Sequence, residues 1–161
     1  MNELLPSFAV VIPMFNEQDG VRNCIERVCG ELARLENRCA LIAVNDGSRD
    51  GTAEILAGFA TQNPLLIVVT HERNLGYGKA LKTGTAQAIQ TGFDYVLFMD
   101  SDMTNDPVDI AKFADKMGKG YDVIKASRYI PGGGVSGVPV RRRLVSWGGN
   151  LLGRILFGLG L

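Results

Sequence analysis

An apolar run that ends in two closely spaced acids constrains the fold of this chain more than any other feature. Residues 95–99 read Tyr-Val-Leu-Phe-Met, and Asp100, Ser101 and Asp102 follow directly. A continuous apolar run of this length is typical of a buried strand in a parallel sheet. Because ligands of open α/β sheets bind at the carboxyl ends of strands, the sequence predicts a ligand site beside these acids.

Asp100 and Asp102 are candidate metal ligands. Side chains two residues apart in an extended segment point to the same side, so both carboxylates can face one cation. Hard oxygen donors without a nearby His or Cys suit Mg²⁺ or Mn²⁺, usually shared with a substrate phosphate. The alternative is that the acids only cap a helix that starts at Pro107, although Asp106 can cap that helix alone.

Apolar runs and helical patterns alternate along the chain. Strands are predicted at residues 8–14, 40–44, 65–70 and 123–127, and helices at about 19–35, 52–59, 79–90 and 107–117. This alternation predicts the α/β class, with a Rossmann-like, doubly wound, mostly parallel sheet flanked by helices. The strand ends then bring a set of polar side chains to one edge of the sheet, namely Asn16, Glu17, Asp46, Asp100 and Asp102.

Two well-known phosphate sites of this fold class do not match the sequence. A dinucleotide-binding domain needs Gly-x-Gly-x-x-Gly after the first strand, where this chain reads Pro-Met-Phe-Asn-Glu from Pro13. A P-loop needs a Gly-Lys-Ser/Thr ending, which the sequence lacks. The Gly-Tyr-Gly-Lys segment at 76–79 can still direct backbone amides and a cation toward a phosphate, so Lys79 is a candidate nucleotide-binding residue.

Composition excludes several classes of protein. The 161 residues suit one domain, and a formal net charge of zero provides no basic field for nucleic acid. The three cysteines, Cys24, Cys29 and Cys39, show no metal spacing and are interpreted as reduced, buried thiols of a cytosolic protein. The sequence shows no secretory pattern and no apolar stretch long enough to cross a bilayer, so a cytoplasmic protein is expected.

Five motifs occur in order along the chain. They are Val-Ile-Pro-Met-Phe-Asn-Glu at 11–17, Asn-Asp-Gly-Ser-Arg-Asp-Gly-Thr at 45–52, Asn-x-Gly at 74–76, Asp-Ser-Asp at 100–102 and Ser-Arg-Tyr at 127–129. Together they resemble the inverting family 2 glycosyltransferases of the GT-A fold, and within these the dolichol-phosphate mannose synthase-like polyprenyl-phosphate glycosyltransferases. The resemblance covers nearly the whole chain, and motifs in series are more specific than any one alone.

The resemblance implies a role for each matching residue. Besides Lys79, the nucleotide-binding residues would be Pro13, Phe15, Glu17, Asp46, which contacts the base, and Asp100. Asp100 and Asp102 would hold Mg²⁺ or Mn²⁺ against the donor diphosphate and, with Arg128, would form the catalytic group. The phosphate groups of donor or acceptor would be bound by Arg128, Arg142 and Ser146.

These roles describe an inverting transferase that moves a sugar from a GDP- or UDP-linked donor to an acceptor, most simply a polyprenyl phosphate. A lipid phosphate oxygen is already anionic and needs no general base, which fits the absence of an obvious His or Glu base. His71, the only histidine, is interpreted as a loop residue. The alternatives are a nucleotide-binding remnant without activity and a nucleotidyltransferase, although the latter needs a Gly-rich motif with Arg and Lys after the first strand.

The chain departs from the family pattern at several places. Asn45 replaces the first acid of the usual Asp-Asp-Gly-Ser, and Phe15 stands where tyrosine is common. Thr104 stands where close relatives have a glutamine that helps hold the metal. The sequence ends at Leu161, before further strands, an Asp-x-Thr-Ser-Gly segment and a late basic residue of the family, so a truncated chain is expected.

The sequence divides into a nucleotide-sugar-binding core at 1–140 and a basic, amphipathic segment at 141–161. Three arginines at 141–143 precede apolar residues at helical spacing that include Trp147. Cations that meet lipid phosphates, beside an apolar face, suit a membrane surface, so a peripheral location at its cytoplasmic face is predicted. The alternatives are a helix that packs on further parts of the domain and the start of a longer hydrophobic segment.

Overall fold

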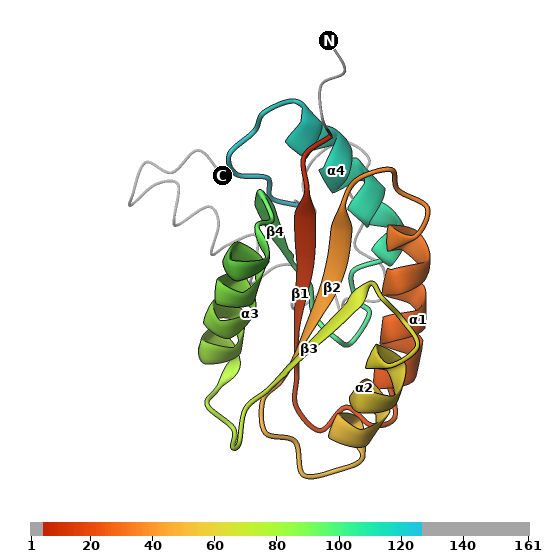
Figure 1. Ribbon diagram of the computed structural model, residues 1–161, viewed down its shortest axis with the longest axis vertical. Helices are drawn as coiled ribbons and strands as arrows, with labels where there is room; N and C mark the ends of the chain where they lie inside the picture. The colour runs from red at the N-terminus through yellow and green to blue at the C-terminus, as the bar shows by residue number, and fades with distance from the viewer. Residues whose placement is uncertain (1–4, 127–161) are drawn as a thin grey trace, which may run out of the picture. The chain divides into compact units, whose positions relative to one another are not determined.

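Strands and helices alternate along residues 5–126, the part of the chain that the computed structural model describes (Figure 1). The strands are β1 (Phe8–Met14), β2 (Cys39–Asn45), β3 (Leu66–Thr70) and β4 (Tyr95–Phe98). The helices are α1 (Val21–Leu32), α2 (Thr52–Ala60), α3 (Tyr77–Thr91), the 3₁₀ turn η1 (Pro107–Asp109) and α4 (Ile110–Gly118). The predicted α/β alternation is confirmed.

The strands form one parallel sheet in the order β3-β2-β1-β4. Strand β1 lies between two neighbours, with Phe8 in register with Cys39 of β2 and with Tyr95 of β4. All seven residues of β1 and all seven of β2 are buried, as expected of inner strands covered on both faces. The predicted doubly wound parallel sheet is therefore confirmed.

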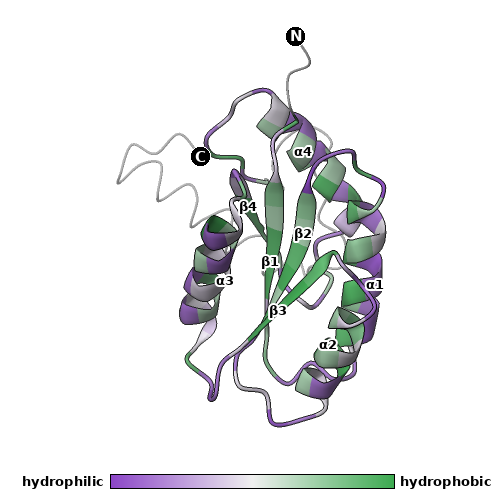
Figure 2. Ribbon diagram, viewed as in Figure 1, coloured by the Kyte–Doolittle hydropathy of each residue, from purple (hydrophilic) through white to green (hydrophobic). Residues whose placement is uncertain are grey.

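Helices cover both faces of the sheet, and β1 separates two apolar layers (Figures 1 and 2). Helices α1, α2 and α4 pack on one face, while α3 packs on the other. Successive residues of β1 point to opposite faces, as strand geometry requires. The first layer takes Phe8, Val10, Ile12 and Met14, and the second takes Ala9 and Val11.

The three cysteines lie in the layer that contains α1. Cys24, Cys29 and Cys39 are buried and free, as predicted. Burial raises the pKa of Cys24 to about 12 and that of Cys29 to about 11, so both remain thiols. Their role in this structure is apolar packing.

Helix α3 approaches the sheet closely because small residues line its inner face. Ala80, Gly84 and Ala88 are its buried residues, spaced by one turn each. A Cβ placed on Gly84 would lie 2.3 Å from Cγ1 of Val11 and 3.2 Å from Cγ2 of Val44. The contact leaves no room for a methyl group.

We therefore expect Gly84→Ala to lower the free energy of unfolding by about 1–3 kcal/mol, because the methyl group overpacks the contact with β1. Gly58→Ala in α2 is the matched control, since nothing lies within 4 Å of its added Cβ. That control should raise the free energy of unfolding by about 0.5–1 kcal/mol. Urea denaturation measures both, and equal effects of the two substitutions would contradict the close packing of α3.

Two predicted elements differ from the structure. The strand predicted at 123–127 is absent from its described residues 123–126, and Val123 is 85% exposed. Strand β4, predicted to be buried, lies at the edge of the described sheet, and Phe98 is 49% exposed. Strand propensity gives a ladder only where a partner strand exists, and the described residues provide none beyond β4. The domain boundary at 140 lies outside the described residues and stays a prediction.

Candidate functional site

The order of the strands places a crevice beside β1. From β1 the chain adds β2 and then β3 toward one edge of the sheet. It then returns to place β4 on the other side of β1. The loops that follow β1 and β4 therefore diverge, and such switch points are where α/β sheets bind ligands. A cleft of about 390 Å³ lies there, lined by Pro13, Met14, Phe15, Glu17, Asp46, Asn74, Gly76, Tyr77, Asp100, Ser101 and Asp102.

Most of the residues predicted for the nucleotide site line this one cleft. The structure brings together residues from the end of β1 and from the loops after β1, β2 and β4, namely Pro13, Phe15, Glu17, Asp46, Asp100 and Asp102. Lys79 lies exposed in the first turn of α3 and is not among the residues that line the cleft. Arg128, Arg142 and Ser146 lie outside the described residues.

Side chains join the loop after β1 to the loop after β2. Asn16, whose φ of 55° is left-handed, begins this connection. The hydrogen bonds run from Asn16 N to Ser48 Oγ (3.0 Å), from Glu17 N to Thr52 Oγ1 (2.9 Å), from Gln18 N to Asp50 Oδ2 (3.1 Å) and from Arg49 N to Asn16 Oδ1 (2.9 Å). These bonds hold the cleft wall that carries Phe15 and Glu17.

Asp46 occupies a buried position at the end of β2. Its Oδ1 accepts the Leu75 N–H at 2.8 Å and contacts Nδ1 of His71 at 2.7 Å. Its Oδ2 accepts the Gly76 N–H at 2.8 Å. Next to it, a Cβ on Gly47 would lie 2.2 Å from the carbonyl carbon of Arg73, so the two loops touch through their backbones.

The partners of Asp46 keep its carboxyl group ionised. Burial alone would raise its pKa, but hydrogen bonds from His71, Leu75 and Gly76 outweigh burial and hold the pKa below its ordinary value. Only 3% of Asp46 is exposed, and it still lines the cleft. The structure thus offers the cleft a fixed, buried, negatively charged acceptor.

Asp100 and Asp102 lie at the opposite wall, each held through one oxygen. Asp100 Oδ1 accepts the phenol of Tyr77 at 2.9 Å. Asp102 Oδ1 accepts the backbone N–H of Thr104 at 3.0 Å and its hydroxyl at 2.9 Å. Between the acids, the Ser101 hydroxyl donates to Glu17 at 3.0 Å. Within residues 5–126, the Oδ2 atom of neither acid has a hydrogen-bond donor.

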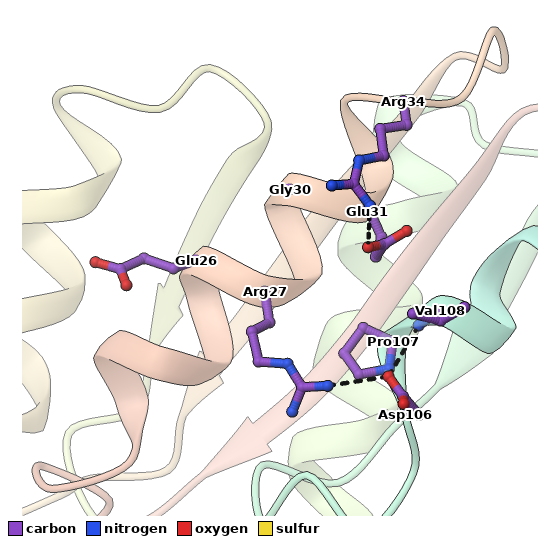
Figure 3. Close-up of a pocket in the computed structure, with 8 residues that line it drawn as sticks. All are labelled: Glu26, Arg27, Gly30, Glu31, Arg34, Asp106, Pro107 and Val108. Carbon is purple, nitrogen blue, oxygen red and sulfur yellow. Dashed lines mark hydrogen bonds and ion pairs between the residues drawn. The ribbon is translucent and has the colours of Figure 1, made fainter.

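A second groove shows that these acids are not needed as helix caps. It has a volume of about 220 Å³ and lies between α1 and η1 (Figure 3). There Asp106 Oδ1 accepts the Val108 N–H at 3.2 Å and pairs with Arg27 Nη2 at 3.0 Å. Asp106 therefore caps η1, as predicted, and Asp100 and Asp102 remain available to the cleft.

The cleft is acidic, and this bears on the predicted metal. Among residues 5–126, its lining includes four carboxylates, Glu17, Asp46, Asp100 and Asp102, and no Lys, Arg or His. No cluster of three or more His, Cys, Asp or Glu side chains in the described part of the chain could hold a metal ion by itself. Two carboxylates with free oxygens do fit Mg²⁺ or Mn²⁺, because such ions often take their other ligands from substrate phosphates and water.

Several contacts in the cleft were not apparent from the sequence. Tyr77, Ser101 and His71 each bind a predicted site residue, yet none was assigned a role. Burial and then the hydrogen bond to Asp100 raise the pKa of Tyr77, so its phenol stays a donor. His71 does lie in a loop, but its side chain is only 9% exposed and pairs with Asp46. The sequence offered one signal for this pair, namely that Asp46 and His71 directly follow two successive strands.

The switch-point cleft and its paired acids define a doubly wound α/β domain of the GT-A type. The chain belongs to a family of this fold, because the family model described as Glycosyl transferase family 2 matches residues 9–157. The predicted family and fold are therefore confirmed.

Relatives of known name support this assignment. Polyprenol monophosphomannose synthase of Mycolicibacterium smegmatis is 30% identical over 153 residues, which cover 94% of this chain and 56% of that protein. Undecaprenyl-phosphate 4-deoxy-4-formamido-L-arabinose transferase of Pectobacterium atrosepticum is 32% identical over 125 residues, covering 77% and 37%. The chain thus spans about half the length, or less, of these relatives.

A solved structure shows the same fold. The mannosyltransferase PcManGT from Pyrobaculum calidifontis, in complex with GDP-Man and Mn²⁺, superposes with a TM-score of 0.58. The match covers 70% of this chain and 32% of that chain at 23% identity. At this identity the likeness concerns the fold.

Proposed function

We propose that this chain is part of an inverting glycosyltransferase that moves a sugar from a nucleotide-diphosphate donor to a polyprenyl phosphate. The observation that carries the proposal is the composition of the switch-point cleft. It combines a fixed acceptor for a base, Asp46, with the exposed aromatic ring of Phe15 and the paired acids Asp100 and Asp102. The named relatives support the acceptor class, since their names specify polyprenol and undecaprenyl phosphates.

The donor nucleotide is GDP- or UDP-linked in this proposal. Its base meets the carboxylate of Asp46, which accepts hydrogen bonds only, while Phe15 and Pro13 supply apolar surface. Its diphosphate is anionic, whereas the described residues that line the cleft include four carboxylates and no basic side chain. A divalent cation would therefore offset the repulsion between the diphosphate and Asp100 and Asp102.

Asp100 and Asp102 would hold that cation, Mg²⁺ or Mn²⁺, through the oxygens that lack a protein donor. When bound, the ion would stabilise the negative charge that develops on the leaving diphosphate. Tyr77 and Thr104 fix the other oxygen of each acid, which orients the carboxylates before the donor arrives. PcManGT, of the same fold, was solved with GDP-Man and Mn²⁺.

Charge also decides the chemistry of the acceptor. A polyprenyl phosphate oxygen is anionic, so it attacks the sugar without a general base. Attack from the face opposite the leaving diphosphate inverts the anomeric centre. Arg128, Arg142 and Ser146 would bind the phosphate groups, and Arg128 would share the charge of the leaving group. Lys79 would approach the nucleotide from the first turn of α3.

A paired assay of binding and turnover tests this function. The chain is incubated with Mg²⁺, GDP-mannose or UDP-glucose, and a short polyprenyl phosphate, and the glycolipid product is analysed for its anomeric configuration. Calorimetry with GDP and UDP measures binding separately. A product of inverted configuration supports the proposal. Nucleotide binding without transfer would favour the non-catalytic remnant. A chain that shows no binding and no transfer would refute both hypotheses.

We propose further that the segment at 141–161 contacts the cytoplasmic face of the membrane. The described helices include none that is both long and apolar enough to cross a bilayer. A lipid acceptor must nevertheless be reached at the membrane. The three arginines at 141–143 precede apolar residues that include Trp147, the only tryptophan of the sequence. Basic residues beside an apolar stripe are typical of interfacial contact.

Anionic liposomes should bind this chain more tightly than zwitterionic ones, since each basic residue contributes about 1 kcal/mol near an anionic surface. Salt should weaken the preference, and the emission of Trp147 should shift to the blue. Replacing the arginines at 141–143 with glutamine should abolish the preference. The matched control replaces Lys112 and Lys116 of α4 and Lys119 directly after it with glutamine, which removes the same charge. An equal loss in both variants would contradict a specific membrane segment.

A further inference from the structure

His71 is the only histidine of the sequence, its side chain is mostly buried, and both of its ring nitrogens have partners. Nδ1 lies 2.7 Å from Asp46 Oδ1, and Nε2 lies 2.9 Å from Thr83 Oγ1 on α3. The imidazole therefore bridges the end of β2 and the helix on the far side of its loop. Both distances are within hydrogen-bond range, so the two contacts fix the position of the ring.

The partners determine which nitrogen carries the proton. Asp46 is ionised and can only accept, since its pKa lies below the ordinary value. Nδ1 must therefore carry a hydrogen and donate it to Asp46. The Thr83 hydroxyl can donate or accept, so Nε2 is free to be the unprotonated nitrogen of a neutral ring. The neutral tautomer assigned by this network has its proton on Nδ1.

The same network limits what Asp46 can still accept. Each carboxylate oxygen offers about two acceptor positions. On Oδ1 both are taken, by His71 and by the Leu75 N–H. On Oδ2 the Gly76 N–H takes one. One acceptor position remains, on Oδ2, and Asp46 lines the cleft.

We propose that His71 is a positioning residue for nucleotide recognition. It anchors Oδ1 of Asp46, so that the free acceptor position of the carboxylate is on Oδ2, ready for one N–H of the donor base. Thr83 in turn holds the imidazole from α3. This inference rests on the proposed function, because it concerns the residue that would meet the base. His71 does not touch the reacting atoms and is not catalytic.

Two substitutions separate this role from simple packing. The amide nitrogen of asparagine can replace Nδ1 of histidine, whereas that of glutamine reaches only the place of Nε2. His71→Asn should therefore keep the donor to Asp46, and His71→Gln should lose it. Packing alone predicts the reverse order, because glutamine comes closer to the volume of histidine.

The test measures the affinity of the chain for GDP and UDP by calorimetry. His71→Ala and His71→Gln should weaken binding by about tenfold, the effect of losing one hydrogen bond to a charged group. The affinity of His71→Asn should stay within about threefold of the wild type. This variant keeps the donor to Asp46 and loses only the neutral hydrogen bond to Thr83, whose contribution is smaller. Thr83→Val should weaken binding modestly, and Thr83→Ser should not. If a His71 variant fails to fold, the comparison of Thr83→Val with Thr83→Ser tests the positioning role instead.

A spectroscopic measurement tests the network without any nucleotide. The sequence has one histidine, so ¹⁵N spectra of the tag-free chain show a single imidazole. A hydrogen on Nδ1 supports the inference, and an Nδ1 without a hydrogen overturns it. Equal nucleotide affinity in all His71 variants, or tighter binding by Gln than by Asn, also overturns it while the proposed function stands. A wild-type chain that binds neither GDP nor UDP removes the proposed function and this inference together.

Discussion

Asp102→Asn should lower the rate of sugar transfer by about 100- to 1,000-fold, the effect of removing one group that stabilises developing charge. Asparagine keeps an oxygen that can accept the two hydrogen bonds of Thr104, so the turn after β4 should survive. What it loses is the anionic oxygen that has no donor within the described residues. The described residues that line the cleft include no basic side chain, so the loss of a cation ligand leaves the donor diphosphate facing the remaining carboxylates.

Donor affinity provides the second measurement for Asp102. The wild type should bind nucleotide more tightly with Mg²⁺ than with a chelator, and Asp102→Asn should show little of this difference. Asp115→Asn is the control, because that acid is exposed on α4, away from the cleft lining, and pairs with Lys119. Equal donor affinity of the wild type with and without chelator would show that Asp100 and Asp102 do not act through a metal.

The sequence predicts the place of this site well because the place depends on local rules. An apolar run followed by acids identifies a strand end, and parallel strands bring their carboxyl ends to one edge. Asp106 could also be assigned correctly, since an acid directly before a proline at a helix start is a local cap signal. The order of the strands was not predicted, because the rule of right-handed crossovers does not say on which side of β1 the chain places β4.

What the sequence could not predict are pairings between distant loops. Tyr77 and Asp100 are 23 residues apart, and Ser101 and Glu17 are 84 residues apart. Such contacts depend on how far each loop projects beyond its strand, which no residue pattern encodes. The same limit applies to the strand predicted at 123–127, where apolar residues have strand propensity but residues 123–126 have no ladder partner among the described strands.

The contact between Asp46 and His71 was missed for a related reason. A buried carboxylate and an imidazole 25 residues apart must both be carried inward by the loops that follow β2 and β3. Gly47, with a φ of 68°, lets the first of these loops touch the backbone of the second. The sequence shows the glycine as a turn residue, but the close approach is visible only in three dimensions.

Asp46→Asn should lower the free energy of unfolding at pH 7 by about 1–3 kcal/mol, the cost of leaving a buried partner unpaired. An amide has one oxygen, so its NH₂ group must face a donor, either the Gly76 N–H or the pair formed by His71 and Leu75. Nucleotide affinity should fall at least tenfold, because the acceptor proposed for the base is disturbed as well. Urea denaturation and calorimetry measure the two effects.

The pH dependence of this loss follows from the sign of the pKa shift. The folded state holds the pKa of Asp46 below its ordinary value, so the ionised carboxylate contributes stability above about pH 4, the range of an unfolded Asp. That contribution disappears as the pH falls through the folded pKa, and the difference between wild type and Asp46→Asn should narrow on acidification. Glu72→Gln is the control, since it removes a charge from an exposed residue of the loop after β3, which also carries His71. A difference that stays constant from pH 7 to about pH 3 would mean that shape rather than the charge of Asp46 holds the loops together.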